Sequence, residues 1–449
     1  MRGRPAWLLI NPPGQTAGPM TKRDWIDNIG AFGLFVFSTG LAAGTGLLAW
    51  GQMFMELAFV LSLPLIWRSL LRDRLFILSI AFYVYLLAYA CLVSPAAGVE
   101  PVLRGGGLDD FLRTGFLTTV VAAFWWVKFH ESGRFSWPVW GFVLGFHIRL
   151  LTNWPLEDWS HGVPWKLGFG LYYNPFGMFC ALVLAWWLVL LLRPDSGRGV
   201  RRTVAIAVAA LIPLLGLIYS ASRGAVVAFL AALLVMLVLW LRDRRDNLFS
   251  WKRIGAGAAA VAVLAFVIVN GPVAKRDPQA LGEIGRILEQ GVGQYVPQEY
   301  SSIGTRVVIW REGTRLWLEK PWFGHGPGPT EASLAELKSR YRLFDSFDFE
   351  NTYLELLVRI GLVGTLFFAF HLFLCGQSFR RGLVAGWYPP DAGRFLLLAC
   401  VIFGVALFFR EGLLELRGRN VATFLLAGLY SFQVANRAVT KTEPDAEPA

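Results

Sequence analysis

The sequence predicts an all-α polytopic membrane protein of about 12 transmembrane helices, and three observations lead to this fold class. Hydrophobic residues make up 55% of the 449 residues and charged residues only 16%, which is far more apolar than a soluble domain requires. Apolar stretches close to the ~20 residues that a helix needs to cross the hydrocarbon recur along the whole chain. Most Lys and Arg residues lie in the short loops between these stretches, as is typical of membrane proteins.

The predicted spans come in two groups. Nine follow one another closely, at residues 31–48, 51–67, 75–93, 111–128, 137–152, 169–192, 203–219, 224–241 and 254–270, and three more lie at 352–375, 395–409 and 420–436. Two pairs of glycines in these spans, Gly40 with Gly44 and Gly141 with Gly145, have the small-xxx-small spacing that allows close helix packing. We therefore expect ordinary close helix packing at both pairs.

The basic residues predict which side of the membrane each loop occupies. With both termini on one side, the segments on that side contain 23 Lys and Arg residues, whereas the short loops on the other contain seven. Because basic residues stay in the cytoplasm, both termini are expected there. The net charge of +11 is thereby explained without nucleic acid, which we do not expect as a partner. Residues 1–28 have no short apolar core before a cleavage site, so the first span is predicted to be an uncleaved anchor.

This orientation places one long segment, 271–351, on the outer side. Residues 271–350 contain ten basic and eleven acidic residues, with helix-like stretches around 303–319 and 331–341, so a folded loop domain is expected. The predicted organisation is a cytoplasmic segment (1–28), nine transmembrane helices (29–270), the loop domain (271–351), three transmembrane helices (352–436) and a disordered cytoplasmic tail (437–449).

Cysteines and histidines predict no metal site. The four cysteines all fall inside predicted spans without paired spacing. No two of the five histidines have the spacing of zinc ligands. The glycine-rich run after residue 323 also lacks the Gly-Lys-Ser/Thr ending of a nucleotide-binding loop. We therefore predict neither a metal nor a cofactor.

One arginine stands between two uncharged runs. Arg223, in SASRGAVVAFL, separates Thr203–Tyr219 from Gly224–Leu241, and a charge near the hydrocarbon costs roughly 2.5–3.5 kcal/mol on insertion scales. The predicted topology puts Arg223 at the outer tip of a hairpin, facing the loop domain. There it would lie near Arg306, Arg311 and Arg315 of GTRVVIWREGTRLW, the last two on one helix face.

Such an outward arginine cluster suits a phosphate-bearing ligand, because guanidinium groups bind phosphate oxygens with two parallel hydrogen bonds and stay charged. The structural alternative is that these arginines contact lipid headgroups or pair with Glu312 and Glu319. That alternative carries more weight for Arg311 and Arg315 than for Arg223.

The stretch DSFDFENTYLE offers acidic candidates at the entry to the tenth span. Asp345, Asp348 and Glu350 supply carboxylates, and one of them can accept a proton from a hydroxyl nucleophile. A divalent cation site and simple solvated charges are the alternatives. In the helix that follows, Asn351, Glu355 and Arg359 recur every four residues, so we expect one inward polar stripe in which Glu355 and Arg359 pair.

Two histidines lie on the predicted outer side. His161 is in the tryptophan-rich loop NWPLEDWSHGVPW, whose aromatic residues suit the membrane interface or sugar stacking. His325, in WFGHGPGPT, is the histidine closest in sequence to the arginine cluster. His325 is therefore a second candidate for the proton acceptor.

Five motifs in order resemble the pattern of the O-antigen ligase and polymerase superfamily: YYNPFG at 172–177, SASRGA, TRVVIW with Arg306 and Trp310, KPWFGHGPG, and ENTYLELLVRIGLVG. They span about residues 172–364, and the twelve-span layout with a large outer loop extends the likeness over the chain. The resemblance implies a GT-C-like glycosyltransferase of the bacterial inner membrane with a periplasmic active site. It implies a donor glycan carried on undecaprenyl pyrophosphate.

The resemblance also implies roles for individual residues. Residues matching Arg223 and Arg306 engage the pyrophosphate in the family's ligases, and a histidine before the Asn of the tenth span activates the acceptor. Here Glu350 stands before Asn351, and Arg359 stands where relatives often carry an acidic residue. The candidate catalytic residues are Glu350, Arg223, Arg306 and His325, and the candidate substrate-binding residues are Arg223, Arg306, Arg311, Arg315, Asn351 and Trp310.

The missing histidine weakens a ligase that acts on lipid A core, so a polymerase of O-antigen or exopolysaccharide repeat units is favoured. The ligase and a protein O-oligosaccharyltransferase are the family alternatives. A flippase or transporter of lipid-linked glycan is the alternative from another class, but it is expected to carry ionisable residues at mid-membrane and repeat-related broken helices. The predicted partners are a lipid-linked oligosaccharide donor, a glycan or lipid A core acceptor, and membrane lipids.

Overall fold

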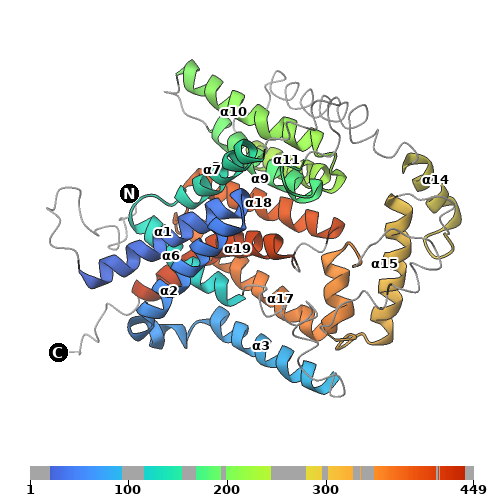
Figure 1. Ribbon diagram of the computed structural model, residues 1–449, viewed down its shortest axis with the longest axis horizontal. Coiled ribbons are helices and arrows are strands. Elements are labelled where there is room, and N and C mark those ends of the chain that lie inside the picture. The colour runs from blue at the N-terminus through green and yellow to red at the C-terminus, as the bar shows by residue number, and fades with distance from the viewer. Residues whose placement is uncertain are drawn as a thin grey trace.

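The computed structural model describes residues 21–93, 116–153, 168–193, 199–243, 280–295, 302–326, 334, 348–410, 413 and 415–439. Every regular element in this part of the chain is a helix (Figure 1). Seven of the described helices are long and apolar enough to cross a membrane. The predicted class, an all-α polytopic membrane protein, is confirmed, whereas the number of twelve spans stays a prediction.

The helices follow the predicted spans closely. They are α1 (Lys22–Ala43), α2 (Thr45–Leu70), α3 (Arg74–Val93), α6 (Phe116–Glu131), α7 (Trp137–Thr152), α9 (Tyr173–Leu191), α10 (Val200–Tyr219), α11 (Arg223–Asp243), α14 (Ala280–Gln290), α15 (Ser302–Glu319), α17 (Thr352–Val384), α18 (Pro390–Ala406), the short 3₁₀ helix η3 (Leu407–Phe409) and α19 (Leu416–Val439). Eleven of the twelve predicted spans overlap described helices, although the first runs from α1 across the turn into α2. The ninth, 254–270, lies outside the described residues, as do His161, Asp345 and the tail after residue 439.

The predicted boundary between the first two spans is shifted. The sequence places it near residue 49, but α1 ends at Ala43 and α2 begins at Thr45, with Gly44 as the turn. α1 also starts earlier than predicted, because the Thr21 hydroxyl accepts from the Asp24 amide and the Asp24 carboxylate accepts from the Thr21 amide. Hydropathy does not detect this polar cap, since it scores only apolar side chains.

Glycines allow the close packing of α1 against its neighbours. A Cβ atom on Gly40 would lie 2.2 Å from the backbone nitrogen of Leu48, and a Cβ atom on Gly145 would lie 1.9 Å from the Thr39 carbonyl oxygen. Gly141 is similarly close to Ser38. The predicted close packing is confirmed at these three glycines, whereas Gly44 lies in the turn and allows space for a side chain.

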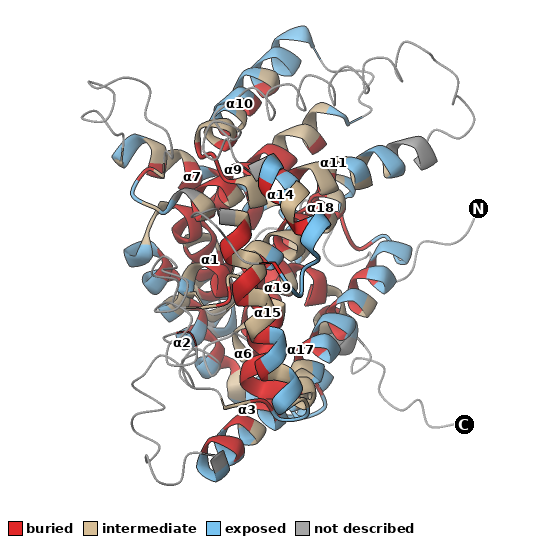
Figure 2. Cartoon of the chain, turned by 90° about the vertical axis from the view of Figure 1, so that its right-hand side faces the viewer, coloured by how far each residue is buried: buried red, intermediate tan, exposed pale blue. Residues whose placement is uncertain are grey.

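The main hydrophobic core runs through the centre of the bundle. α9 is the most enclosed of the candidate spans, with 67% of its apolar window buried, whereas the corresponding value for α10 is 22%. Figure 2 shows buried residues gathered around α1 and α9 and exposed residues on α10 and α3. The outer helices therefore present apolar side chains outward, as a lipid-facing surface requires.

The membrane helices alternate between two ends of the bundle. At one end, here called the basic end, the His130 ring stacks on Trp387 with centroids 3.4 Å apart and Arg193 pairs with Asp391 at 2.9 Å. At the opposite end, here called the loop end, Arg149 donates to the carbonyl oxygens of Ala42, Ala43 and Phe169. These contacts join the ends of helices that are far apart in sequence.

Two helical segments lie across the loop end. In Figure 1, α15 and the first part of α17 run crosswise to the bundle at the right-hand side. They pack through an apolar cluster of Val308, Ile309, Leu316, Leu334, Phe349, Leu354 and Val358. A Cβ atom on Gly313 of α15 would lie 2.7 Å from the Leu354 side chain, so the two segments touch closely.

α17 is broken at Gly361, which has φ 63° and ψ −170°. The segment 321–326 satisfies the backbone groups that the break exposes. His325 and Gly326 donate to the carbonyls of Val358 and Arg359, while Leu362 and Val363 donate to those of Pro321 and Trp322. Tyr85 and Tyr89 of α3 donate to the carbonyls of Ile360 and Gly324. The break is therefore fixed by tertiary hydrogen bonds, which unsatisfied backbone groups in a membrane protein require.

Candidate functional site

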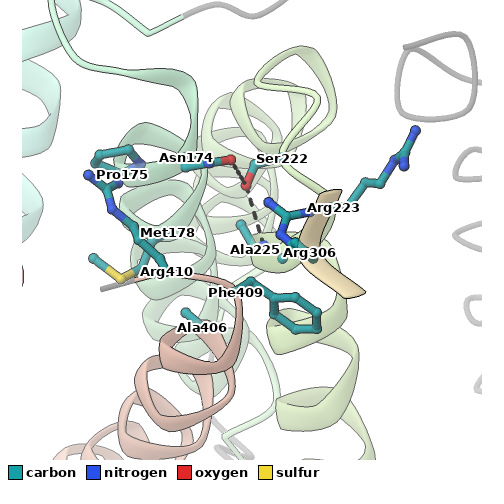
Figure 3. Close-up of a pocket in the computed structure, with 11 residues that line it drawn as sticks. Asn174, Pro175, Met178, Ser222, Arg223, Ala225, Arg306, Ala406, Phe409 and Arg410 are labelled. Carbon is teal, nitrogen blue, oxygen red and sulfur yellow. Dashed lines mark hydrogen bonds between the residues drawn. The ribbon is translucent and has the colours of Figure 1, made fainter. Parts of the chain in front are cut away.

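Three arginines from three separate elements line one pocket at the loop end. They are Arg223 at the start of α11, Arg306 in the first turns of α15, and Arg410 directly after η3. The remaining lining comes from Asn174, Pro175, Met178, Ser222, Gly224, Ala225, Ala406 and Phe409, and the space amounts to about 480 Å³, part of it open to solvent. Figure 3 shows the side chains that line it. We call this cavity the arginine pocket.

The tip between α10 and α11 places Arg223. The Ser222 hydroxyl accepts from the Ala225 amide at 3.4 Å and so caps the start of α11. The same hydroxyl donates to the Asn174 side-chain oxygen at 2.9 Å (Figure 3). Arg223 is thus the first helical residue after a fixed tip, as the hairpin interpretation of SASRGA predicted. A Cβ atom on Gly224 would lie 2.9 Å from Phe409, so this glycine lets η3 approach the tip.

The YYNPFG segment forms the opposite wall. It begins α9, where Pro175 is tolerated because amides of the first turn have no partner within the helix. Gly177 allows close approach of the tip, since a Cβ atom there would lie 2.8 Å from the Ser220 hydroxyl. Asn174 therefore links α9 to the residue that caps α11.

The helix termini add to the positive potential of the pocket. Both α9 and α11 begin at the pocket, with Asn174, Pro175, Arg223 and Gly224 in its wall. Each helix N-terminus carries roughly half an elementary positive charge from its unsatisfied amides. Two helix starts and three guanidinium groups together form a site suited to a large anion.

The structure pairs Arg306 with Glu350. The two side chains approach to 2.6 Å, and they are 19% and 37% exposed, so the ion pair is open to solvent and beside the pocket. Glu350 has a left-handed backbone with φ 48°, which is uncommon for a residue other than glycine. Strained residues of this kind cluster at functional sites.

The surrounding turn holds Glu350 in this conformation. Its amide donates to the Asp348 carboxylate, and the Phe349 amide donates to Glu355 at 3.2 Å. Trp310 of α15 donates from its indole to the Phe349 carbonyl at 2.9 Å. Trp310 therefore contacts the backbone next to Glu350 and positions this turn against α15.

Asn351 starts α17. Its side-chain oxygen accepts from the amides of Tyr353 and Leu354 at 3.1 and 3.2 Å, so it is the N-cap of the helix. One turn further, Glu355 and Arg359 form a buried ion pair at 2.7 Å, which confirms the predicted pairing. The polar stripe thus caps the start of α17 through Asn351 and forms a buried ion pair within the helix through Glu355 and Arg359.

The structure separates Arg306 from the other arginines of its helix. Arg311 donates to the backbone carbonyls of Gly293 and Tyr295 and so fastens the segment after α14. Arg315 pairs with Glu312 and Glu319 on the surface of α15. Neither Arg311 nor Arg315 lines the arginine pocket.

His325 also lies outside the pocket lining. Its ring nitrogen Nε2 lies 2.7 Å from the Leu316 carbonyl oxygen, and its amide donates to Val358 in the break of α17. Glu350, the first candidate for the proton acceptor, lies beside the pocket because it pairs with Arg306. The His325 ring instead contacts the C-terminal part of α15 at Leu316.

Arg410 was not singled out from the sequence. Its carbonyl oxygen accepts from the amide and hydroxyl of Thr352, and its side chain pairs with Glu415. The sequence does contain three arginines within residues 410–419 on the predicted outer side, where basic residues are otherwise scarce. Its closeness to Arg223 and Arg306 depends on the packing of α18 against α11.

No group of three metal-ligating side chains occurs among the described residues. Asp345, a member of the alternative cation site, lies outside them. The absence of a metal and a cofactor therefore stays a prediction.

The fold and the pocket define a polytopic membrane protein with a cavity lined by three arginines at one end of its bundle. Residues 208–369 match the model of the family described as O-antigen ligase. This stretch contains α11, α15 and the first part of α17, and with them Arg223, Arg306 and Glu350. The match supports the O-antigen ligase and polymerase superfamily for this region of the chain, and members of this superfamily are glycosyltransferase-like enzymes. No curated protein matches the chain.

Proposed function

We propose that the protein is a polymerase that joins glycan repeat units carried on undecaprenyl pyrophosphate. The observation that carries the proposal is the convergence of Arg223, Arg306 and Arg410 on one pocket at the loop end. A pyrophosphate offers several anionic oxygens, and guanidinium groups from three directions can bind them simultaneously. The starts of α9 and α11 contribute further to the binding of this anion.

The transfer step needs a proton acceptor and stabilisation of the leaving group. A hydroxyl oxygen of the acceptor sugar forms a bond to the anomeric carbon of the donor, and the bond from that carbon to the phosphate oxygen breaks. The electron pair leaves with the pyrophosphate, whose charge is stabilised by the three arginines. The proton of the acceptor hydroxyl passes to the carboxylate of Glu350.

The ion pair between Arg306 and Glu350 suggests how donor binding prepares this step. In the free protein the two side chains are 2.6 Å apart. A bound pyrophosphate competes with Glu350 for the same guanidinium group, because both are anionic and the pair is partly exposed. Donor binding then releases the Glu350 carboxylate toward the acceptor hydroxyl.

The ligase is the second candidate, since the matched family carries that description. The polymerase is favoured because Glu350 replaces the histidine that the resemblance implies in ligases. A transporter is disfavoured because the break in α17 is filled by residues 321–326, whose backbone groups form hydrogen bonds with those of the break. The proposed location is the bacterial inner membrane, with the loop end in the periplasm and both termini in the cytoplasm.

Reconstituted protein tests the pocket. Protein in liposomes is given undecaprenyl-pyrophosphate-linked oligosaccharide, and extension of the glycan is followed by mass spectrometry. We expect Arg223→Ala, Arg306→Ala and Arg410→Ala each to reduce transfer by about 10²-fold or more. Arg315→Ala is the matched control, since it removes the same charge from α15 outside the pocket. Equal losses for Arg306→Ala and Arg315→Ala would contradict the proposed site.

Deletion of the gene in its host separates the two candidate functions. Loss of the polymerase leaves single repeat units in place of long polymer in every glycan fraction. Loss of a ligase leaves full-length polymer on the lipid carrier and none on lipid A. The second outcome would reverse the ranking of polymerase over ligase.

A further inference from the structure

A second polar cavity lies at the basic end, far from the arginine pocket. It is bounded by Arg74 at the start of α3, Gln377 and Arg381 near the end of α17, and Tyr430 and Gln433 of α19, together with Leu374. Its volume is about 440 Å³, part of it open to solvent. We call this cavity the basic-end pocket.

The basic-end pocket is cationic. Arg74 and Arg381 have no salt-bridge partner among the residues that the structure describes. The neighbouring carboxylate of Asp73 is already engaged, because it accepts from the amides of Leu75 and Phe76 and from the Tyr430 hydroxyl. Two guanidinium groups that face one space repel each other unless an anion lies between them, and a phosphate group fits both.

Apolar side chains continue from the arginines along both helices. On α17, Phe373, Phe370 and Leu366 precede Gln377 by 4, 7 and 11 residues and so share its face, and they are 57%, 48% and 56% exposed. On α3, Ile77 and Val84 follow Arg74 and are 51% and 60% exposed. Both helices are candidate membrane spans, so these exposed side chains contact lipid chains.

We propose that the basic-end pocket binds the headgroup of an anionic phospholipid. The phosphate lies between Arg74 and Arg381, the amides of Gln377 and Gln433 bind the polar part next to it, and the acyl chains extend along the apolar faces of α3 and α17. A polar, cationic cavity above apolar stripes matches a lipid in both chemistry and shape. This site is independent of the arginine pocket and of the proposed transfer reaction.

Native mass spectrometry of delipidated full-length protein in detergent tests the site. Phosphatidylglycerol is titrated against phosphatidylcholine of the same acyl chains. We expect the double variant Arg74→Gln with Arg381→Gln to weaken phosphatidylglycerol binding about 30-fold, since each arginine near an anionic headgroup contributes about 1 kcal/mol. Both side chains are exposed, so the variant is expected to keep its thermal midpoint without lipid.

The matched control is Arg72→Gln with Arg380→Gln, which removes the same charge at the same end from exposed positions outside the pocket. Near-normal phosphatidylglycerol binding by this control supports a defined site. Equal weakening of both double variants, or equal binding of the two lipids by the unaltered protein, overturns the proposal in favour of diffuse attraction. Inorganic phosphate alone is the second probe. The contrary result is that inorganic phosphate raises the thermal midpoint of the unaltered protein as much as phosphatidylglycerol does, and fails to raise that of the Arg74→Gln with Arg381→Gln variant. That result would assign the site to a soluble phosphate and overturn the lipid assignment.

Discussion

Two ion pairs whose glutamates are five residues apart in sequence serve opposite purposes. Glu350 pairs with Arg306 at 2.6 Å and Glu355 pairs with Arg359 at 2.7 Å, so the distances are nearly equal. The first pair is partly exposed beside the arginine pocket, whereas the side chains of the second are 0% and 8% exposed. Exposure to a ligand, and not the length of the ion pair, therefore distinguishes a candidate catalytic group from a structural one.

The difference follows from what each pair loses when it is broken. A buried pair has given up its hydration, so removal of one charge leaves the other without a partner in an apolar environment. A partly exposed pair contributes little to stability, because water and ions replace either partner. The Arg306 pair can consequently be exchanged for a phosphate ligand, while the Arg359 pair cannot.

The largest effect is expected from Glu355→Gln. It leaves the Arg359 charge buried against a neutral amide, and loss of one partner of a buried pair costs about 3–5 kcal/mol of stability. The yield of monodisperse protein after extraction is expected to collapse. The double variant Glu355→Gln with Arg359→Gln should recover part of that yield, and unaltered yield from the single variant would show that the pair contributes little.

Glu350→Gln sharpens the comparison, because it makes the same chemical change at the exposed pair. Transfer is expected to fall by about 10²-fold or more through loss of the proton acceptor. The thermal midpoint is expected to stay near that of the unaltered protein. His325→Ala is the companion variant, since that ring lies outside the pocket. A pH–rate profile in which the His325 variant loses more activity than the Glu350 variant would assign the proton acceptor to His325.

Gly361→Ala tests the break that separates the two parts of α17. Gly361 has φ 63°, and a Cβ atom there would lie 2.4 Å from the Trp322 carbonyl oxygen. A strained residue of this kind costs on the order of 1–3 kcal/mol, so the thermal midpoint should fall. Gly376→Ala, in the same helix with open space around its Cβ position, is the control and should leave the midpoint unchanged or raised.

The smallest effect is expected at Arg315. Its pairs with Glu312 and Glu319 lie on the helix surface, where such pairs contribute about 0–1 kcal/mol. Arg315→Gln should therefore change neither the thermal midpoint nor the transfer rate by a measurable amount. A strong loss of transfer would show that Arg315, like Arg306, takes part in the reaction, and would contradict the distinction between the two arginines.

The sequence predicted the helices well because the bilayer limits the alternatives. An apolar run of about 20 residues must satisfy its backbone groups internally, so hydropathy places both the helix and its approximate ends. Local chemistry also sufficed for the pairing of Glu355 with Arg359, since residues four apart lie on one helix face. The same argument placed Arg223 at a hairpin tip, because its flanking runs contain no charge.

Spacing along the chain could not separate Arg306 from Arg311 and Arg315, since all three lie on one helix and only its first turns reach the tip of the α10–α11 hairpin. Arg410 is 104 residues away from Arg306, and only the approach of α18 to α11 brings it to the pocket. The break at Gly361 is likewise stabilised by residues 321–326, which local propensity does not connect to it. Helices were determined by the sequence through local hydrophobicity and backbone hydrogen bonding, whereas the site was decided by the tertiary structure, because its charges come from segments that only packing brings together.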